Sequence, residues 1–102
     1  MSNMKDFVIK FDERSNLWEH GYKPNMFAVR TTISYVCDLF RERGYLFVRE
    51  IYERLGIPFT RESIVAGWYD TKSRPTFGIG GNEESGIIVI TFSAEEDIRD
   101  YF

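Results

Sequence analysis

Cysteine and histidine are nearly absent from this sequence, which has one residue of each, Cys37 and His20. A single cysteine excludes an intramolecular disulfide, so a reducing compartment fits the chain best. One cysteine and one histidine also provide no ligand set for a zinc site and no cysteine–histidine nucleophile pair. We therefore expect neither a metal site nor a cofactor, and we interpret His20 as a solvated residue of a polar loop.

Long apolar runs are missing as well. No stretch approaches the roughly 18 uninterrupted apolar residues that a membrane-spanning helix needs. The beginning of the chain also lacks the apolar segment of a signal peptide. Charged residues interrupt it at Lys5, Asp6, Lys10, Asp12 and Glu13. We expect a cytoplasmic protein that makes no contact with a membrane.

Catalytic motifs are a third absence. The glycines near position 80 do not form a phosphate-binding loop, because no Lys-Ser or Lys-Thr pair follows them and the next element is predicted to be a strand. Adjacent acids such as Glu83 and Glu84 are typical of a solvated surface, since a catalytic carboxylate needs burial or a fixed partner to shift its pKa. We predict that the chain is not an enzyme.

Apolar residues are nevertheless abundant enough for one folded domain over residues 1–102. Hydrophobic residues make up 43% of the chain and aromatic residues 17%, far from the composition of a disordered segment. Alternation over 7–11 predicts a first strand, and the polar stretch 14–23 predicts a loop. Pro24 then suits the start of a long helix that ends near Arg43. Its apolar stripe has spacings of three and four: Met26, Val29, Ile33, Val36 and Phe40.

Two shorter helices are predicted after the long one. The first spans 48–55, where apolar residues share one helical face. Thr60 is expected to cap the second, because its hydroxyl can accept hydrogen bonds from the free backbone donors of the first turn. This second segment runs to Ala66, and Gly67 is expected to close it.

The C-terminal third predicts a hairpin. Strands over 76–79 and 87–92 are expected to pair as a hairpin whose link is 82–86. Because 87–92 is apolar throughout, we predict a central strand that is covered on both faces. Ser93 and Glu96 have capping-box spacing, which predicts a short terminal helix. Its apolar residues Ile98, Tyr101 and Phe102 are expected to pack on the sheet. The predicted fold class is α+β, with an N-terminal strand, a long amphipathic helix, one or two short helices and a C-terminal antiparallel β-hairpin.

Charge is distributed unevenly along the chain, whose net charge is −3. Residues 81–102 carry six acids and one base, a net charge of −5, while the other 80 residues carry 12 bases and 10 acids, a net charge of +2. Such a field can steer a basic partner, but acids at a helix start also complement the helix dipole, and both interpretations stay open. The candidate partner-binding residues are Glu83, Glu84, Glu95, Glu96, Asp97 and Asp100.

Residues 48–67 raise the alternative of a helix-turn-helix, with residues 56–59 as the link between two helices. The second helix would then face DNA. It offers Arg61 beside Glu62, followed by uncharged residues, which is a poor surface for phosphate groups. We favour core packing for this segment and do not expect nucleic acid as a partner.

Several short motifs recur in a known family. They are Glu50-Ile51-Tyr52, Leu55-Gly56-Ile57-Pro58, Thr60, Gly67-Trp68 and the apolar strand 87–92. With them, residues 45–92 resemble a family of small uncharacterised proteins from prophages and mobile elements of Gram-positive bacteria. This chain departs from the family at the short link 82–86 and at Ala94-Glu95-Glu96. The resemblance implies an origin in a bacterial host and assigns no activity and no functional residue.

The leading functional hypothesis is a non-enzymatic interaction protein of a phage or mobile element. In its specific form the chain is an anti-CRISPR-like inhibitor, whose acidic end occupies the basic surface of a host protein that handles nucleic acid. Two alternatives stay open: a small helix-turn-helix-like DNA-binding regulator, and a structural phage protein or antitoxin-like protein. The sequence predicts neither the identity of the partner nor the oligomeric state.

Overall fold

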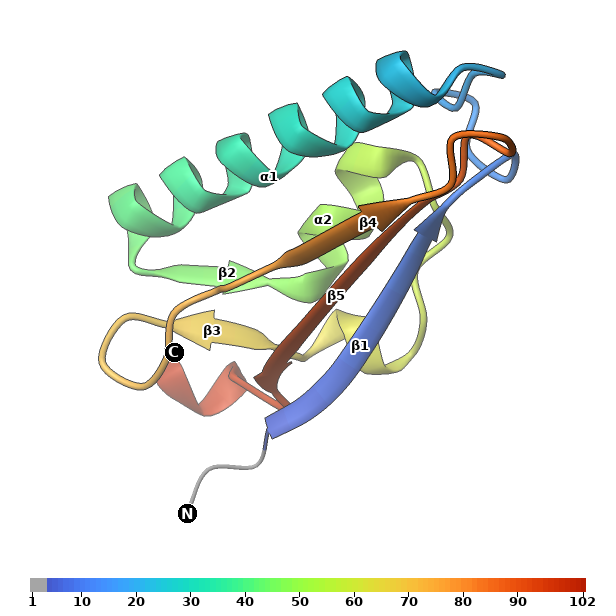
Figure 1. The fold of residues 1–102 in the computed structure, drawn as a ribbon. Coiled ribbons are helices and arrows are strands. Elements are labelled where there is room, and N and C mark those ends of the chain that lie inside the picture. Colours follow the sequence, from blue (N-terminus) through green and yellow to red (C-terminus); the bar gives the residue numbers. More distant parts are fainter. Residues whose placement is uncertain (1–3) are drawn as a thin grey trace.

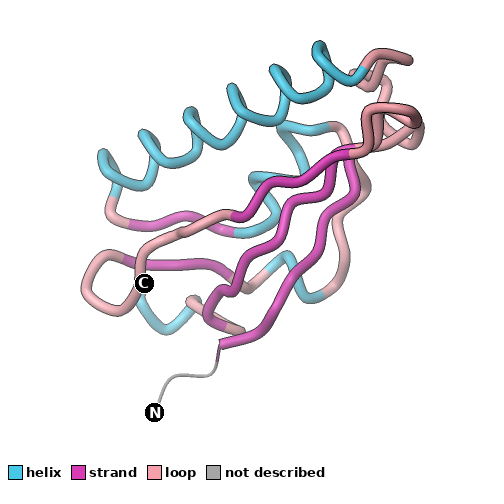
Figure 2. Tube along the Cα trace, in the orientation of Figure 1, coloured by secondary structure: helices cyan, strands magenta, loops and turns pink. Residues whose placement is uncertain are grey.

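A computed structural model describes residues 4–102 and shows an α+β fold in which helices pack against an antiparallel sheet (Figure 1). Two α-helices and two 3-10 turns accompany the strands in residues 4–102. Figure 2 colours the helical segments cyan and the strands magenta. The helical elements are α1 (Tyr22–Arg43), α2 (Val48–Leu55), η1 (Glu62–Ile64) and η2 (Arg99–Tyr101). The strands are β1 (Met4–Phe11), β2 (Tyr45–Phe47), β3 (Gly67–Tyr69), β4 (Gly78–Gly81) and β5 (Ile88–Glu95).

Strand β5 is the centre of the sheet, whose order is β1-β5-β3-β2 with β4 also paired to β5. On one side β5 pairs with the full length of β1, from Met4 opposite Glu95 to Phe11 opposite Ile88. On the other side β4 pairs with the first half of β5, and β3 meets its last residue, Glu95. The central strand is therefore confirmed, and so is its hairpin with β4.

Only one face of the sheet is covered. In β1 the side chains of Phe7, Ile9 and Phe11 are buried, whereas Val8 between them is 60% exposed. The same alternation continues through β5, where Thr91 is exposed. The prediction that β5 is covered on both faces is therefore wrong, because α1 and α2 supply their buried side chains to one shared core and leave the outer face of the sheet open.

Helix α1 confirms the predicted apolar stripe. Val29, Val36 and Phe40 are buried, and the helix ends at Arg43 as expected. Gly44 follows in the left-handed conformation with φ of 82°, and its N–H donates to the carbonyl of Phe40 at 2.7 Å. The helix begins at Tyr22, so the predicted start at Pro24 falls inside its first turn.

The second predicted helix is confirmed as α2, but the third is wrong. Residues 60–66 contain only the 3-10 turn η1, although the hydroxyl of Thr60 accepts a hydrogen bond from the N–H of Ser63 at 3.3 Å, as a cap would. Gly67 opens β3 instead of closing a helix. Since only one α-helix forms in residues 48–67, the two-helix motif of the DNA-binding alternative is not formed.

The end of the chain also differs from its prediction. Ser93 and Glu96 do not form a capping box, because β5 continues to Glu95 along the ladder with β1. Ser93 therefore lies inside a strand and cannot cap a helix. Only the 3-10 turn η2 follows. Ile98 reaches the core at 1% exposure as expected, whereas Tyr101 and Phe102 remain 40% and 66% exposed.

Candidate functional site

The structure divides the six predicted binding acids between two ends of β5. Glu83 and Glu84 are exposed on the link between β4 and β5, while the other four follow one another from the last residue of β5 into η2. The two groups lie at opposite ends of the eight-residue strand β5, which spans about 25 Å. In Figure 1 the link and η2 accordingly lie at opposite ends of the sheet. One continuous acidic surface is therefore not formed.

Four of the acids gather around a single pocket of about 250 Å³. Its walls come from β3, the turn after β3, the end of β5 and η2, which are brought together by the pairing of β3 with β5. We call it the η2 pocket; it is lined by Tyr69, Lys72, Glu95, Glu96, Asp97, Ile98, Asp100 and Tyr101. The volume is below the range typical of sites for small molecules and cofactors, so it suits a single side chain.

Asp97 is the one acid of this group with a fixed ionic partner. The Arg99 guanidinium donates to both carboxylate oxygens, with Nη2 at 2.6 Å from Oδ2 and Nε at 3.0 Å from Oδ1. The Oδ1 atom also accepts the backbone N–H of Arg99 at 3.0 Å. The side-chain hydrogen bond from Arg99 lowers the pKa of Asp97 to about 2, and Asp97 in turn raises the pKa of Arg99. Asp97 therefore holds the η2 turn together.

The remaining acids, Glu95, Glu96 and Asp100, form no ion pair within residues 4–102. Lys72 is the one base that lines the pocket, and it forms no ion pair with a described carboxylate either. With Asp97 neutralised by Arg99, three carboxylates face one ammonium group. The residues that line the η2 pocket therefore include more acids than bases.

Glu95 is the most buried acid of the group, at 6% exposure. It is the last residue of β5 and lies opposite Met4 of β1 and Gly67 of β3. Sequence reasoning named Glu95 as a candidate but treated it as a surface acid. Its burial could not be predicted, because Gly67 was expected to close a helix, no strand was predicted over 67–69, and no local pattern places Gly67 beside Glu95.

The aromatic walls of the pocket were missed in the sequence. Tyr69 of β3 and Tyr101 of η2 are 32 residues apart, yet their rings stack with centroids at 4.6 Å and an interplanar angle of 27°. No spacing rule links two such residues. The pairing exists because β3 and the end of β5 are neighbours in the sheet.

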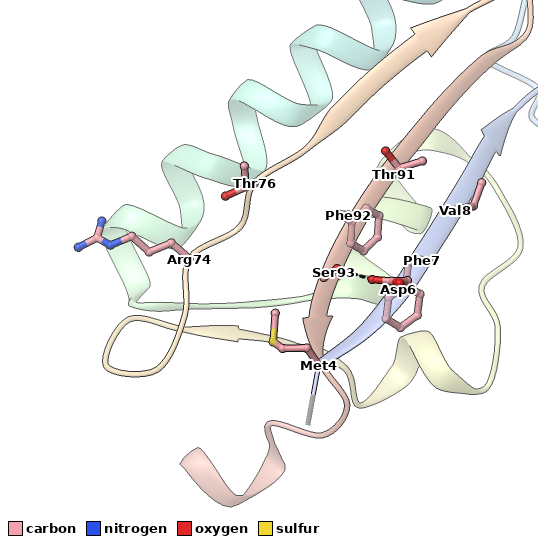
Figure 3. A pocket seen from close by; sticks show the side chains of 9 residues that line it. All are labelled: Met4, Asp6, Phe7, Val8, Arg74, Thr76, Thr91, Phe92 and Ser93. Atoms are coloured by element: carbon pink, nitrogen blue, oxygen red, sulfur yellow. Dashed lines mark hydrogen bonds between the residues drawn. The ribbon is translucent and has the colours of Figure 1, made fainter. Parts of the chain in front are cut away.

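A second hollow, of about 570 Å³, lies on the open face of the sheet (Figure 3). There the hydroxyl of Ser93 donates a hydrogen bond to the carboxylate of Asp6, its register partner on β1. In Figure 3 these two side chains point toward each other, while Arg74 extends away from them. His20 is in the loop before α1, with its ring edge on Trp18 at 4.9 Å, so residues 4–102 do not assemble a serine–histidine–acid arrangement.

Three further kinds of site were considered in residues 4–102: a metal site, a cysteine nucleophile and a membrane-spanning helix. Among residues 4–102, no three histidine, cysteine, aspartate or glutamate side chains are placed to hold a metal ion. Burial raises the pKa of the Cys37 thiol, which is the opposite of what activates a cysteine nucleophile. None of the helices in this range combines the length and apolarity required to span a bilayer.

Comparison with known proteins gives one match. A family model described as a family of unknown function (DUF6353) matches residues 2–102, nearly the whole chain. The description names neither an activity nor an origin, so the prophage origin stays a prediction. No curated protein and no solved structure shows significant similarity to the chain.

Proposed function

We propose that the chain, which belongs to the DUF6353 family, is a non-enzymatic binding protein that docks a basic surface of a partner protein at its η2 pocket. One observation carries this proposal: four acids converge on one pocket in which a single carboxylate, that of Asp97, is neutralised within the described chain. Complementary charge speeds association and selects partners.

The test uses two charge-matched variants. Glu96→Gln with Asp100→Asn removes two negative charges at the η2 pocket, and Glu83→Gln with Glu84→Gln removes the same charge at the other end of β5. The tagged wild type and both variants are used to capture partners from a lysate of the source cells, and captured proteins are quantified by mass spectrometry. We expect the pocket variant to lose a basic partner at least about tenfold and the link variant to retain it.

Two results would contradict the proposal. Equal loss in both variants would mean that the total charge matters and the pocket does not. Full retention in the pocket variant would remove the pocket from the interface. Capture repeated at higher salt adds an independent check, because an interface between exposed charges weakens as salt screens them.

A finer proposal concerns the class of partner. We propose that the basic surface belongs to a nucleic-acid-handling defence complex such as CRISPR, and that the chain acts for a phage or mobile element. The resemblance of residues 45–92 to prophage proteins supports this version, together with the excess of acids over bases in the η2 pocket. A short DNA duplex added to the captured complex is expected to displace the partner. A partner that stays bound under saturating duplex, with its DNA affinity unchanged, would refute the finer version.

A further inference from the structure

Glu95 is a buried acid without a partner inside the described chain. Its side chain is 6% exposed and lines the η2 pocket, yet it forms no hydrogen bond or ion pair with any side chain of residues 4–102. The Glu95 carboxylate is not among the side-chain atoms of residues 4–102 that are fully enclosed without a hydrogen-bond partner, which are Arg43 Nε and Ser73 Oγ. The other three buried polar residues among 4–102, Ser15, Asn25 and Ser63, all have side-chain hydrogen bonds. Glu95 therefore has no cationic partner among residues 4–102.

The walls beside Glu95 favour one kind of cation. The stacked rings of Tyr69 and Tyr101 line the same pocket, and aromatic faces attract cations, most often the guanidinium of arginine. The same fold already uses this contact on the neighbouring strand, where the Arg43 guanidinium lies 4.1 Å from the centre of the Tyr45 ring. Tyr45 is the register partner of Tyr69, so both tyrosines belong to one outer surface of the sheet.

We propose that the η2 pocket takes the guanidinium group of an arginine side chain, an inference that rests on the proposed function and names the partner's contact group. Glu95 accepts two parallel hydrogen bonds from the planar guanidinium, and the rings of Tyr69 and Tyr101 pack against its face and stem. Glu96 and Asp100 add charge at the rim. An arginine fits this combination better than a lysine, whose ammonium is a compact, strongly hydrated point charge without a planar fork.

Lys72 and metal ions are the competing cations. Lys72 lines the pocket but forms no ion pair with Glu95, and it is exposed on the turn after β3. The carboxylates of the described chain are not arranged as a metal site, so a divalent ion is not the favoured occupant.

The experiment uses three blocked peptides of sequence Gly-Gly-Xaa-Gly-Gly, in which Xaa is arginine, lysine or citrulline. Citrulline keeps the shape of arginine and removes its charge. Each peptide is titrated into isotope-labelled protein, and amide shifts are followed by NMR. We expect the arginine peptide to shift the amides of Glu95, Tyr69 and Tyr101 in a saturable way, the lysine peptide to bind at least about fivefold more weakly, and the citrulline peptide to cause no shift.

Protein variants test whether the arginine peptide binds at the η2 pocket. Glu95→Gln keeps the size of the side chain and is expected to weaken the arginine peptide at least about tenfold. The protein should stay folded, because Glu95 forms no ion pair among residues 4–102 that the change would break. The thermal unfolding midpoint provides the check. Glu83→Gln at the far end of β5 is the matched control and should bind like the wild type. Tyr101→Leu should reduce the preference for arginine over lysine.

Three outcomes would overturn the arginine pocket: equal binding of the arginine and lysine peptides, unchanged binding by Glu95→Gln, or shifts that appear away from the η2 pocket. These failures are distinct from failure of the proposed function. If Glu95→Gln still captures the cellular partner while the Glu96 and Asp100 double variant does not, the acidic docking surface stands and the arginine pocket is wrong.

Discussion

At the scale of single residues, Asn25 shows how one buried amide joins distant loops. Its Oδ1 accepts the N–H of Glu19 at 2.8 Å, and its Nδ2 donates to the carbonyls of Glu19 at 2.6 Å and Gly86 at 2.9 Å. The side chain is 1% exposed. One residue in the first turn of α1 thus holds the preceding loop against the β4–β5 link, which carries Glu83 and Glu84.

Replacement of Asn25 is expected to be costly. Asn25→Ala removes the partner of the Glu19 N–H and one of the two hydrogen bonds to the Gly86 carbonyl, which keeps the one from Trp18 Nε1. An unsatisfied buried polar group costs about 1–3 kcal/mol. We expect a loss of about 2–3 kcal/mol in the free energy of unfolding, measured by urea denaturation. The exposed Asn16→Ala is the control and should change stability by less than about 0.5 kcal/mol. Equal effects of the two changes would contradict this role for Asn25.

Asp97 gives a prediction about pH. Its folded pKa is about 2, below its ordinary value of 3.8, because Arg99 stabilises the ionised form. A depressed folded pKa stabilises the protein fully above pH 3.8, and this contribution is lost as the pH falls toward 2. An NMR titration of the carboxyl carbon should therefore show Asp97 ionised until about pH 2. Arg99→Leu should raise the midpoint toward 3.8, whereas Arg74→Leu should leave it unchanged.

At the scale of elements, β3 depends on close backbone packing that only glycine permits. A Cβ added at Gly67 would lie 2.1 Å from the carbonyl oxygen of Leu46 and 2.8 Å from a methyl group of Ile98. Gly67 pairs with Phe47 on one side and Glu95 on the other, so it joins the two halves of the sheet. Because Gly67 has no side chain, β3 can lie close to β2 and to the end of β5, and this brings the residues of the η2 pocket together.

Two glycine substitutions test this packing. Gly67→Ala is expected to destabilise the protein by at least about 2 kcal/mol, because the backbone of Leu46 must move to admit the methyl group. Gly80→Ala is the control on β4: a Cβ there meets no atom within 4 Å, so stability should stay the same or rise by about 0.5 kcal/mol. Thermal or urea unfolding measures both. A tolerated alanine at Gly67 would refute the close packing.

Elements differed in how well local patterns predicted them. α1 and α2 follow from apolar spacing and terminal glycines, since hydrogen bonds within a helix are local. β3 was missed, although Trp68 within it is fully buried and donates from Nε1 to the carbonyl of Ser93 at 2.9 Å. A three-residue strand has no detectable period. It forms because β2 and β5 supply its partners.

At the scale of the whole molecule, the fold is a sheet with one covered face and one open face. The covered face holds the core, and the open face carries the hollow of Figure 3 and, at the end of β5, Glu95 of the η2 pocket. β5 is flanked by strands on both sides, whereas β4 is short and exposed. The centre of stability therefore lies in β5.

Hydrogen exchange should reflect this arrangement. The amides of Ile90 and Phe92 in the middle of β5 are expected to exchange only through global unfolding, because β5 pairs along its full length with β1 and carries buried core residues. The amides of β4 are expected to exchange at least about tenfold faster through local opening. NMR-detected exchange of the native protein measures both groups. Protection of β4 equal to that of β5 would contradict the placement of β5 as the most stable strand.

The sequence by itself determined the fold class, the long helix, the β4–β5 hairpin and the acidic character of the C-terminal segment, because each is encoded by neighbours in the chain. Only the tertiary structure decided the rest. Pairing of β5 with β1 and β3 replaced a predicted terminal helix, carried Glu83 and Glu84 away from the other acids, and buried Glu95 beside Tyr69 and Tyr101. Contacts between residues far apart in sequence set these outcomes, and no local pattern records them.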